Sequence, residues 1–96
     1  MAPITPLPVR RVAVYELMNL TRLESALVIT GDDERAVRER LRGPLPLELA
    51  RWNPRTDDVS VQLLSPSLGE DLAEEFVKTY LNNMRQRTWR FQVWRF

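Results

Sequence analysis

The chain of 96 residues contains neither cysteine nor histidine. The lack of cysteine excludes disulfides, thiolate metal sites and cysteine nucleophiles. The lack of histidine removes the usual general base near neutral pH and the commonest metal ligand. No apolar run approaches the roughly 20 residues of a membrane span, and the N-terminal segment lacks the apolar stretch of a signal peptide. We therefore expect a cytoplasmic protein, without a membrane segment, in which any chemistry uses carboxylate, phenol or amine groups.

The composition is that of a folded protein, with 44% hydrophobic and 28% charged residues. A chain of this length builds one domain with a modest core. Three prolines within residues 1–8 stiffen the start of the chain and remove backbone donors, so we expect an extended arm over residues 1–9. Residues 10–96 are then one domain.

Hydrophobic patterning predicts strands and helices in the order β-β-α-(α)-β-α-β. Two apolar runs rich in β-branched residues predict a hairpin, and the acidic stretch after them caps a helix. Ser67 and Glu70 have the spacing of a capping box and predict the start of the longest helix. This order predicts an α+β fold with a small antiparallel sheet flanked by helices. The predicted strands cover residues 12–17, 25–30, 58–64 and 88–96, and the predicted helices cover residues 33–42, 45–52 and 68–84.

Two short triplets lie in the predicted hairpin. Ala13-Val14-Tyr15 is in its first strand, and Leu27-Val28-Ile29, followed by Thr30, is in its second. Together with the element order, these triplets resemble the GIY-YIG nuclease domain over about residues 12–84. That family has a three-stranded antiparallel sheet flanked by helices, so the resemblance implies the same fold here.

The resemblance also implies roles for individual residues. Tyr15 takes the place of a catalytic tyrosine, and Arg35 that of the arginine that grips the scissile phosphate, with Arg38 as the alternative. Glu75 takes the place of the metal ligand, with Glu74 beside it. Each residue also has an ordinary structural role open to it: a packed tyrosine, an arginine paired with an acid on its own helix, and a solvated glutamate. No cofactor is expected unless the nuclease role holds, which requires Mg²⁺ or Mn²⁺.

The second triplet departs from the family pattern. Leu27 stands in place of the tyrosine to which the resemblance assigns activation of the attacking water, and Ile29 stands in place of a glycine. We therefore expect a catalytically degenerate GIY-YIG-like domain that serves as an interaction or nucleic-acid-binding module. One alternative is an active, divalent-metal-dependent DNA endonuclease. The other is a protein-interaction or homodimerisation domain that uses the C-terminal strand.

The last segment, residues 88–96, alternates aromatic and basic side chains. Such a strand stacks nucleobases and contacts phosphates, completes the core, or pairs with a homodimer or protein partner as an exposed edge. Because the net charge is only +1, general attraction to nucleic acid is weak, and these local residues would carry the binding. The candidate nucleic-acid or partner contacts are Arg87, Arg90, Trp94, Arg95 and Phe96.

Overall fold

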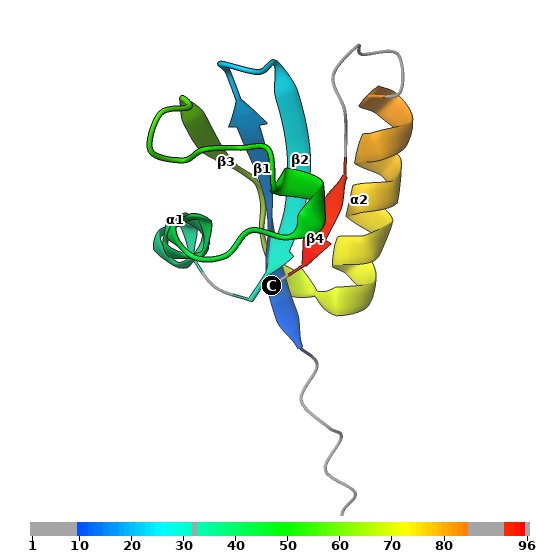
Figure 1. The fold of residues 1–96 in the computed structure, drawn as a ribbon. Coiled ribbons are helices and arrows are strands. Elements are labelled where there is room, and N and C mark those ends of the chain that lie inside the picture. The colour runs from blue at the N-terminus through cyan, green and yellow to red at the C-terminus, as the bar shows by residue number, and fades with distance from the viewer. Residues whose placement is uncertain (1–9, 32, 85–91, 96) are drawn as a thin grey trace, which may run out of the picture.

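A computed structural model describes residues 10–31, 33–84 and 92–95. Within these residues, four strands form a mixed sheet in the order β3-β1-β2-β4, and two α-helices pack against it (Figure 1). The predicted α+β class is confirmed. The elements are β1 (Arg11–Asn19), β2 (Glu24–Thr30), α1 (Glu34–Arg42), a 3₁₀ turn (Leu47–Leu49), β3 (Val59–Gly69), α2 (Glu70–Met84) and β4 (Val93–Arg95).

The two apolar runs form the predicted antiparallel hairpin, in which Tyr15 lies opposite Val28. Residues 20–23 make the turn, and the Asn19 side chain accepts the backbone N–H of Arg22 at 2.9 Å. Leu23, next to β2, has a φ of 55°, in the left-handed region that leucine rarely adopts. The hairpin is therefore built on a turn with one strained residue.

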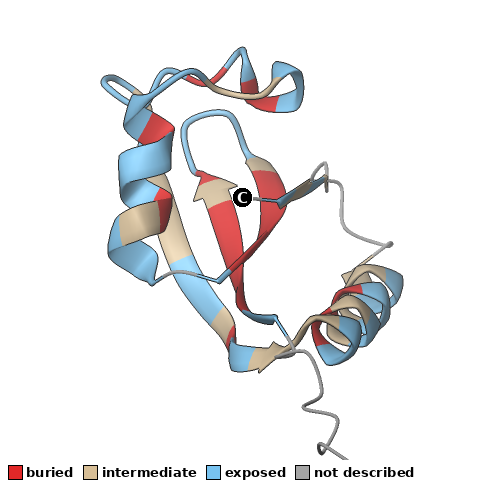
Figure 2. Ribbon diagram, turned by 90° about the horizontal axis from the view of Figure 1, so that it is seen from below, coloured by how far each residue is buried: buried red, intermediate tan, exposed pale blue. Residues whose placement is uncertain are grey.

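Each face of the sheet carries its own core because side chains along a strand alternate between the two faces. α1 and the chain that follows it cover the first face, and α2 covers the second (Figure 2). β1 contributes to both. The first core holds Ala13, Tyr15, Leu17, Ala26, Val28, Val37, Leu41, Leu49 and Trp52, and the second holds Val12, Val14, Leu27, Ile29, Ala73 and Val77.

Both helices begin beside acidic residues, as expected from the helix dipole. Asp33 caps α1 by accepting the backbone N–H of Ala36 at 3.0 Å. On α2 the buried stripe is centred on Ala73 and Val77, whereas Leu72 is 64% exposed. Tyr80 donates a hydrogen bond to the carboxylate of Glu16, which is buried on the same face of the sheet.

The predicted capping box is wrong. β3 does not end near residue 64 but continues to Gly69, which pairs with Arg11, so Ser67 belongs to the strand and α2 begins at Glu70. The Arg11 guanidinium donates to Ser67 Oγ at 3.3 Å, and the Glu70 N–H donates to the Arg10 carbonyl at 2.9 Å. Contacts with Arg10 and Arg11 thus occupy the Ser67 hydroxyl and the Glu70 N–H that a capping box would join. Two register shifts in this pairing give β3 extra residues.

Two other expectations need correction. The predicted helix over residues 45–52 is a single 3₁₀ turn, although Leu49 and Trp52 are buried as expected. The sheet is antiparallel only for β1, β2 and β3, because β4 pairs parallel with β2. The predicted arm over residues 1–9, and all of the last predicted strand except residues 92–95, lie outside the described residues. In the part of the chain described here, neither helix has the length and apolar character to cross a membrane.

Candidate functional site

The three residues that the nuclease resemblance singles out do not come together. Tyr15 is buried in the first core, beneath α1, with 6% of its surface exposed. Arg35 lies on the solvent side of α1, with 87% of its side chain exposed, and pairs with Glu39 at 3.5 Å. Glu75 is exposed on α2, which covers the other face of the sheet. The sheet therefore separates Tyr15 from Glu75.

The two alternative residues, Arg38 and Glu74, are engaged in ion pairs. Arg38 pairs with Glu34 of its own helix at 3.1 Å, and Glu74 pairs with Arg95 of β4 at 3.0 Å. Among the described residues, no group of three or more acidic side chains is placed to hold a metal ion. The described structure thus gives no assembled nuclease site.

The described part of the C-terminal strand completes the sheet. Trp94 is partly buried against the first core, and Arg95 reaches Glu74 on the opposite side. Arg87, Arg90 and Phe96 lie outside the described residues. Of the three roles considered for this segment, Trp94 itself is placed for packing.

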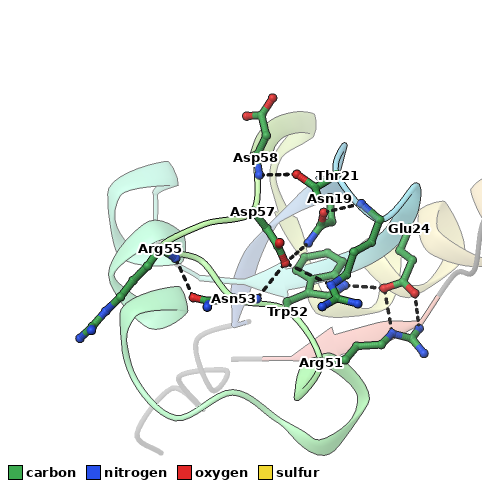
Figure 3. Close-up of polar contacts among 10 residues, drawn as sticks. Asn19, Thr21, Glu24, Arg51, Trp52, Asn53, Arg55, Asp57 and Asp58 are labelled. Atoms are coloured by element: carbon green, nitrogen blue, oxygen red, sulfur yellow. Dashed lines mark hydrogen bonds and ion pairs between the residues drawn. The ribbon is translucent and has the colours of Figure 1, made fainter.

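The loop over residues 53–58, which we call the braced loop, is tied to the β1–β2 turn. Its anchor is Asp57, whose Oδ2 accepts the backbone N–H of Asn53 at 2.8 Å, Nδ2 of Asn19 at 3.0 Å and Nε of Arg22 at 3.3 Å (Figure 3). The N–H of Asp58 adds a bond of 2.9 Å to Oγ1 of Thr21. These contacts hold the loop in one conformation.

The same contacts lower the pKa of the Asp57 carboxyl below its ordinary value of 3.8. The backbone N–H of Asn53 has the largest effect, followed by the side chain of Asn19, while burial acts in the opposite direction and the charge of Arg22 again lowers the pKa. Only 8% of the Asp57 side chain is exposed. The ionised carboxylate is therefore the form that braces the loop.

A second brace lies just before this loop. The Glu24 carboxylate, at the start of β2, accepts Trp52 Nε1 at 2.6 Å and two guanidinium nitrogens of Arg51 at 2.8 and 2.9 Å. Trp52 is 4% exposed and belongs to the first core. These bonds hold Arg51 and Trp52 in place, directly before the braced loop begins.

A hollow of about 450 Å³ lies between the end of α1 and the braced loop, and we call it the arginine hollow. Two basic residues, Arg42 of α1 and Arg55 of the braced loop, are among the residues that line it. Asn53 accepts the backbone N–H of Arg55 at 3.1 Å, and Figure 3 shows the Arg55 side chain pointing away from the braced contacts. The lining residues are Leu41, Arg42, Gly43, Leu45, Asn53, Pro54 and Arg55.

The two arginines of the arginine hollow differ in their ion pairing from most of the other arginines that the structure describes. Within the described residues, neither Arg42 nor Arg55 makes a side-chain ion pair, whereas Arg22, Arg35, Arg38, Arg51 and Arg95 all do. A guanidinium in this setting is ready to bind an anion, because it is charged at any physiological pH and presents planar, paired donors.

An adjoining hollow of about 280 Å³ has a different character. It shares Leu41, Arg42 and Pro54 with the arginine hollow, and Arg38, Asp57, Asp58 and Val59 complete its lining. Its charged residues are therefore of both signs, whereas the charged residues that line the arginine hollow are both basic.

No pattern in the sequence is a sufficient signal for this site. Residues 53–58 read as a polar turn, and Arg42 reads as one of four arginines on a solvated helix. Only the path of the chain between α1 and β3 places Arg42 and Arg55 on one hollow. A comparison of the chain with family models, curated proteins and solved structures finds no match in any of the three. What the structure itself provides at this place is a hollow lined by two basic residues that make no side-chain ion pair within the described ranges.

Proposed function

We propose that this domain is a non-catalytic, GIY-YIG-like binding module for nucleic acid, with phosphate held between Arg42 and Arg55. The observation that carries the proposal is that Arg42 and Arg55 line one hollow and make no side-chain ion pair with any residue that the structure describes. Arginine is over-represented where phosphate or carboxylate is recognised, because a guanidinium binds these groups through two parallel hydrogen bonds, and phosphate oxygens receive many of the hydrogen bonds that proteins make to DNA. Catalysis forms no part of the proposal because Tyr15 and Glu75 lie on opposite sides of the sheet.

The braces support this function because they fix the backbone on which Arg55 stands. A contact made from a fixed loop loses less conformational entropy on binding than one made from a mobile loop. The binding is expected to need no metal. Added Mg²⁺ or Mn²⁺ should act only as a competing counterion.

The test is fluorescence anisotropy of a labelled oligonucleotide titrated with the full chain at several salt concentrations. Affinity should fall as salt rises, with a log–log slope of about −0.7 for each phosphate neutralised on a single strand. The variant Arg42→Gln with Arg55→Gln should lose most of this binding. Arg35→Gln removes an exposed charge of α1 outside the hollow and should keep the binding. Absence of binding at low salt, or equal binding by both variants, would contradict the proposal.

A second candidate function, association through the C-terminal strand, has one observation in its favour. Among the described strands β4 has a neighbour on one side only, so its other edge is open to a second copy or another protein. Sedimentation equilibrium over a wide concentration range tests the homodimer. A single monomeric species throughout would remove it.

A further inference from the structure

We infer that the arginine hollow accepts an unpaired nucleobase together with its phosphate, so that the ligand is a single-stranded polynucleotide and not a duplex. This inference rests on the proposed function and names its ligand class. It follows from what lies between the two arginines.

The floor of the hollow is apolar. Leu41 is buried, with 6% of its surface exposed, and Leu45 is partly buried against the first core. Pro54 forms the adjacent wall and is exposed. A site for phosphate alone has no use for an apolar floor, whereas a nucleobase gains from covering one with its face.

The hollow, at about 450 Å³, leaves room for a small planar group such as a nucleobase. A duplex would touch the two guanidinium groups with its backbone but leave this space empty, since its bases are stacked inside the helix. A single strand can turn one base outward, and arginine planes stack on bases as well as bind phosphates.

The adjoining hollow is less favourable for phosphate because its charges are of both signs. Asp58 lines it and makes no side-chain ion pair within the described residues, so its carboxylate repels a phosphate placed there. The carboxylate of Asp57 is already used in bracing the loop, whereas Asp58 is joined to the rest of this network through its backbone. The charge of Asp58 can therefore be removed without loosening the braces.

The experiment compares four probes with the full chain at one salt concentration: a labelled deoxyribose strand, the ribose strand of the same sequence, the matched duplex, and a strand of equal length without bases. We expect both single strands to bind about tenfold more tightly than the duplex, which is the ratio that one inserted base can supply. The abasic strand, which keeps every phosphate, should bind as weakly as the duplex.

Variants of exposed residues provide matched controls. Pro54→Ser should lower the affinity for the single strand about threefold and leave that for the duplex unchanged, while Pro44→Ser, at an exposed proline that does not line the arginine hollow, should change neither. Asp58→Asn should raise the affinity for every probe by a similar small factor. Melting curves of each variant show that it is folded.

The outcomes distinguish the insertion of a base from the nucleic-acid-binding function on which it rests. Equal binding of single strand, abasic strand and duplex, lost in the Arg42→Gln and Arg55→Gln variant, would overturn the inserted base but leave the nucleic-acid function standing. Failure of every probe to bind would remove both. Selective binding of the strands that carry bases supports both, and a difference between the ribose and deoxyribose strands would identify the natural ligand.

Discussion

Leu23 has a left-handed backbone conformation that leucine rarely adopts, and its side chain is exposed, so the strain of the β1–β2 turn can be tested at this residue. It is the only non-glycine residue with positive φ in the described ranges, at 55°, and it is 60% exposed. In this conformation the Cβ atom approaches the following carbonyl oxygen, which costs an ordinary residue about 1–2 kcal/mol. Little packing offsets the cost.

The test compares Leu23→Gly with Leu23→Ala, which remove the same atoms beyond Cβ and differ only in Cβ itself. Glycine relieves about 1–2 kcal/mol of strain but loses about 0.4–1 kcal/mol through the greater freedom of the unfolded chain. We therefore expect Leu23→Gly to be more stable than Leu23→Ala by about 0.5–1 kcal/mol. Leu20 is the matched control, because it is an exposed leucine of the same turn without positive φ. There the order should reverse, with the Leu20→Ala variant more stable than Leu20→Gly.

Urea unfolding followed by tryptophan fluorescence measures these differences, since Trp52 is 4% exposed and changes its environment on unfolding. In a domain of this size a change of 1 kcal/mol moves the melting temperature by about 4–8 °C, so in thermal unfolding the two Leu23 variants should differ by about 2–8 °C. The reasoning is refuted if Leu23→Ala is at least as stable as Leu23→Gly, or if both positions show the same order.

Three further outcomes follow from the burial and bonding of individual side chains. Folding lowers the pKa of Asp57 below 3.8, so the unfolded chain takes up a proton at this carboxyl before the folded chain does as the pH falls. The free energy of unfolding should therefore decline below about pH 4. Urea titrations at several pH values should show a smaller decline for Asp57→Asn. Leu17→Ala should cost about 2–5 kcal/mol of unfolding free energy because Leu17 is fully buried, whereas Leu47→Ala, at a residue 89% exposed, should leave the urea midpoint nearly unchanged. Tyr80→Phe should cost about 1–3 kcal/mol by taking a donor from the buried Glu16 carboxylate, and a double-mutant cycle with Glu16→Gln that shows no coupling would contradict this.

The sequence was sufficient for those parts of the fold that local patterns decide. The β-branched runs of the hairpin and the acidic cap of α1 both lie where they were predicted. The capping box at Ser67 failed because its local preference competed with pairing to β1, and the long-range pairing prevailed. The direction of β4 also could not be predicted, since nothing in a single strand specifies which neighbour it pairs with or in which sense.

The candidate site was beyond prediction for a related reason. Spacing along an element shows which residues share a face, but it does not show which face of the sheet each helix covers. Tyr15 and Glu75 were grouped by resemblance, and the packing of α1 and α2 on opposite faces separates them. Arg42 and Arg55 were not grouped, because their proximity depends on hydrogen bonds between the loop and the hairpin turn.

The central position of β1 limits how the length of this chain can change over evolutionary time. Alternate residues of β1 supply the cores beneath α1 and α2, so one deletion in its middle would exchange the faces of every side chain on one side of the deletion. Buried Glu16 would then face the apolar core of α1, far from Tyr80. The connection that begins with the exposed residues Gly43 and Pro44 carries no such alternation, and residues added there cost mainly loop entropy. Insertions and deletions should therefore accumulate in such connections, while the length of β1 stays constant among descendants of this chain.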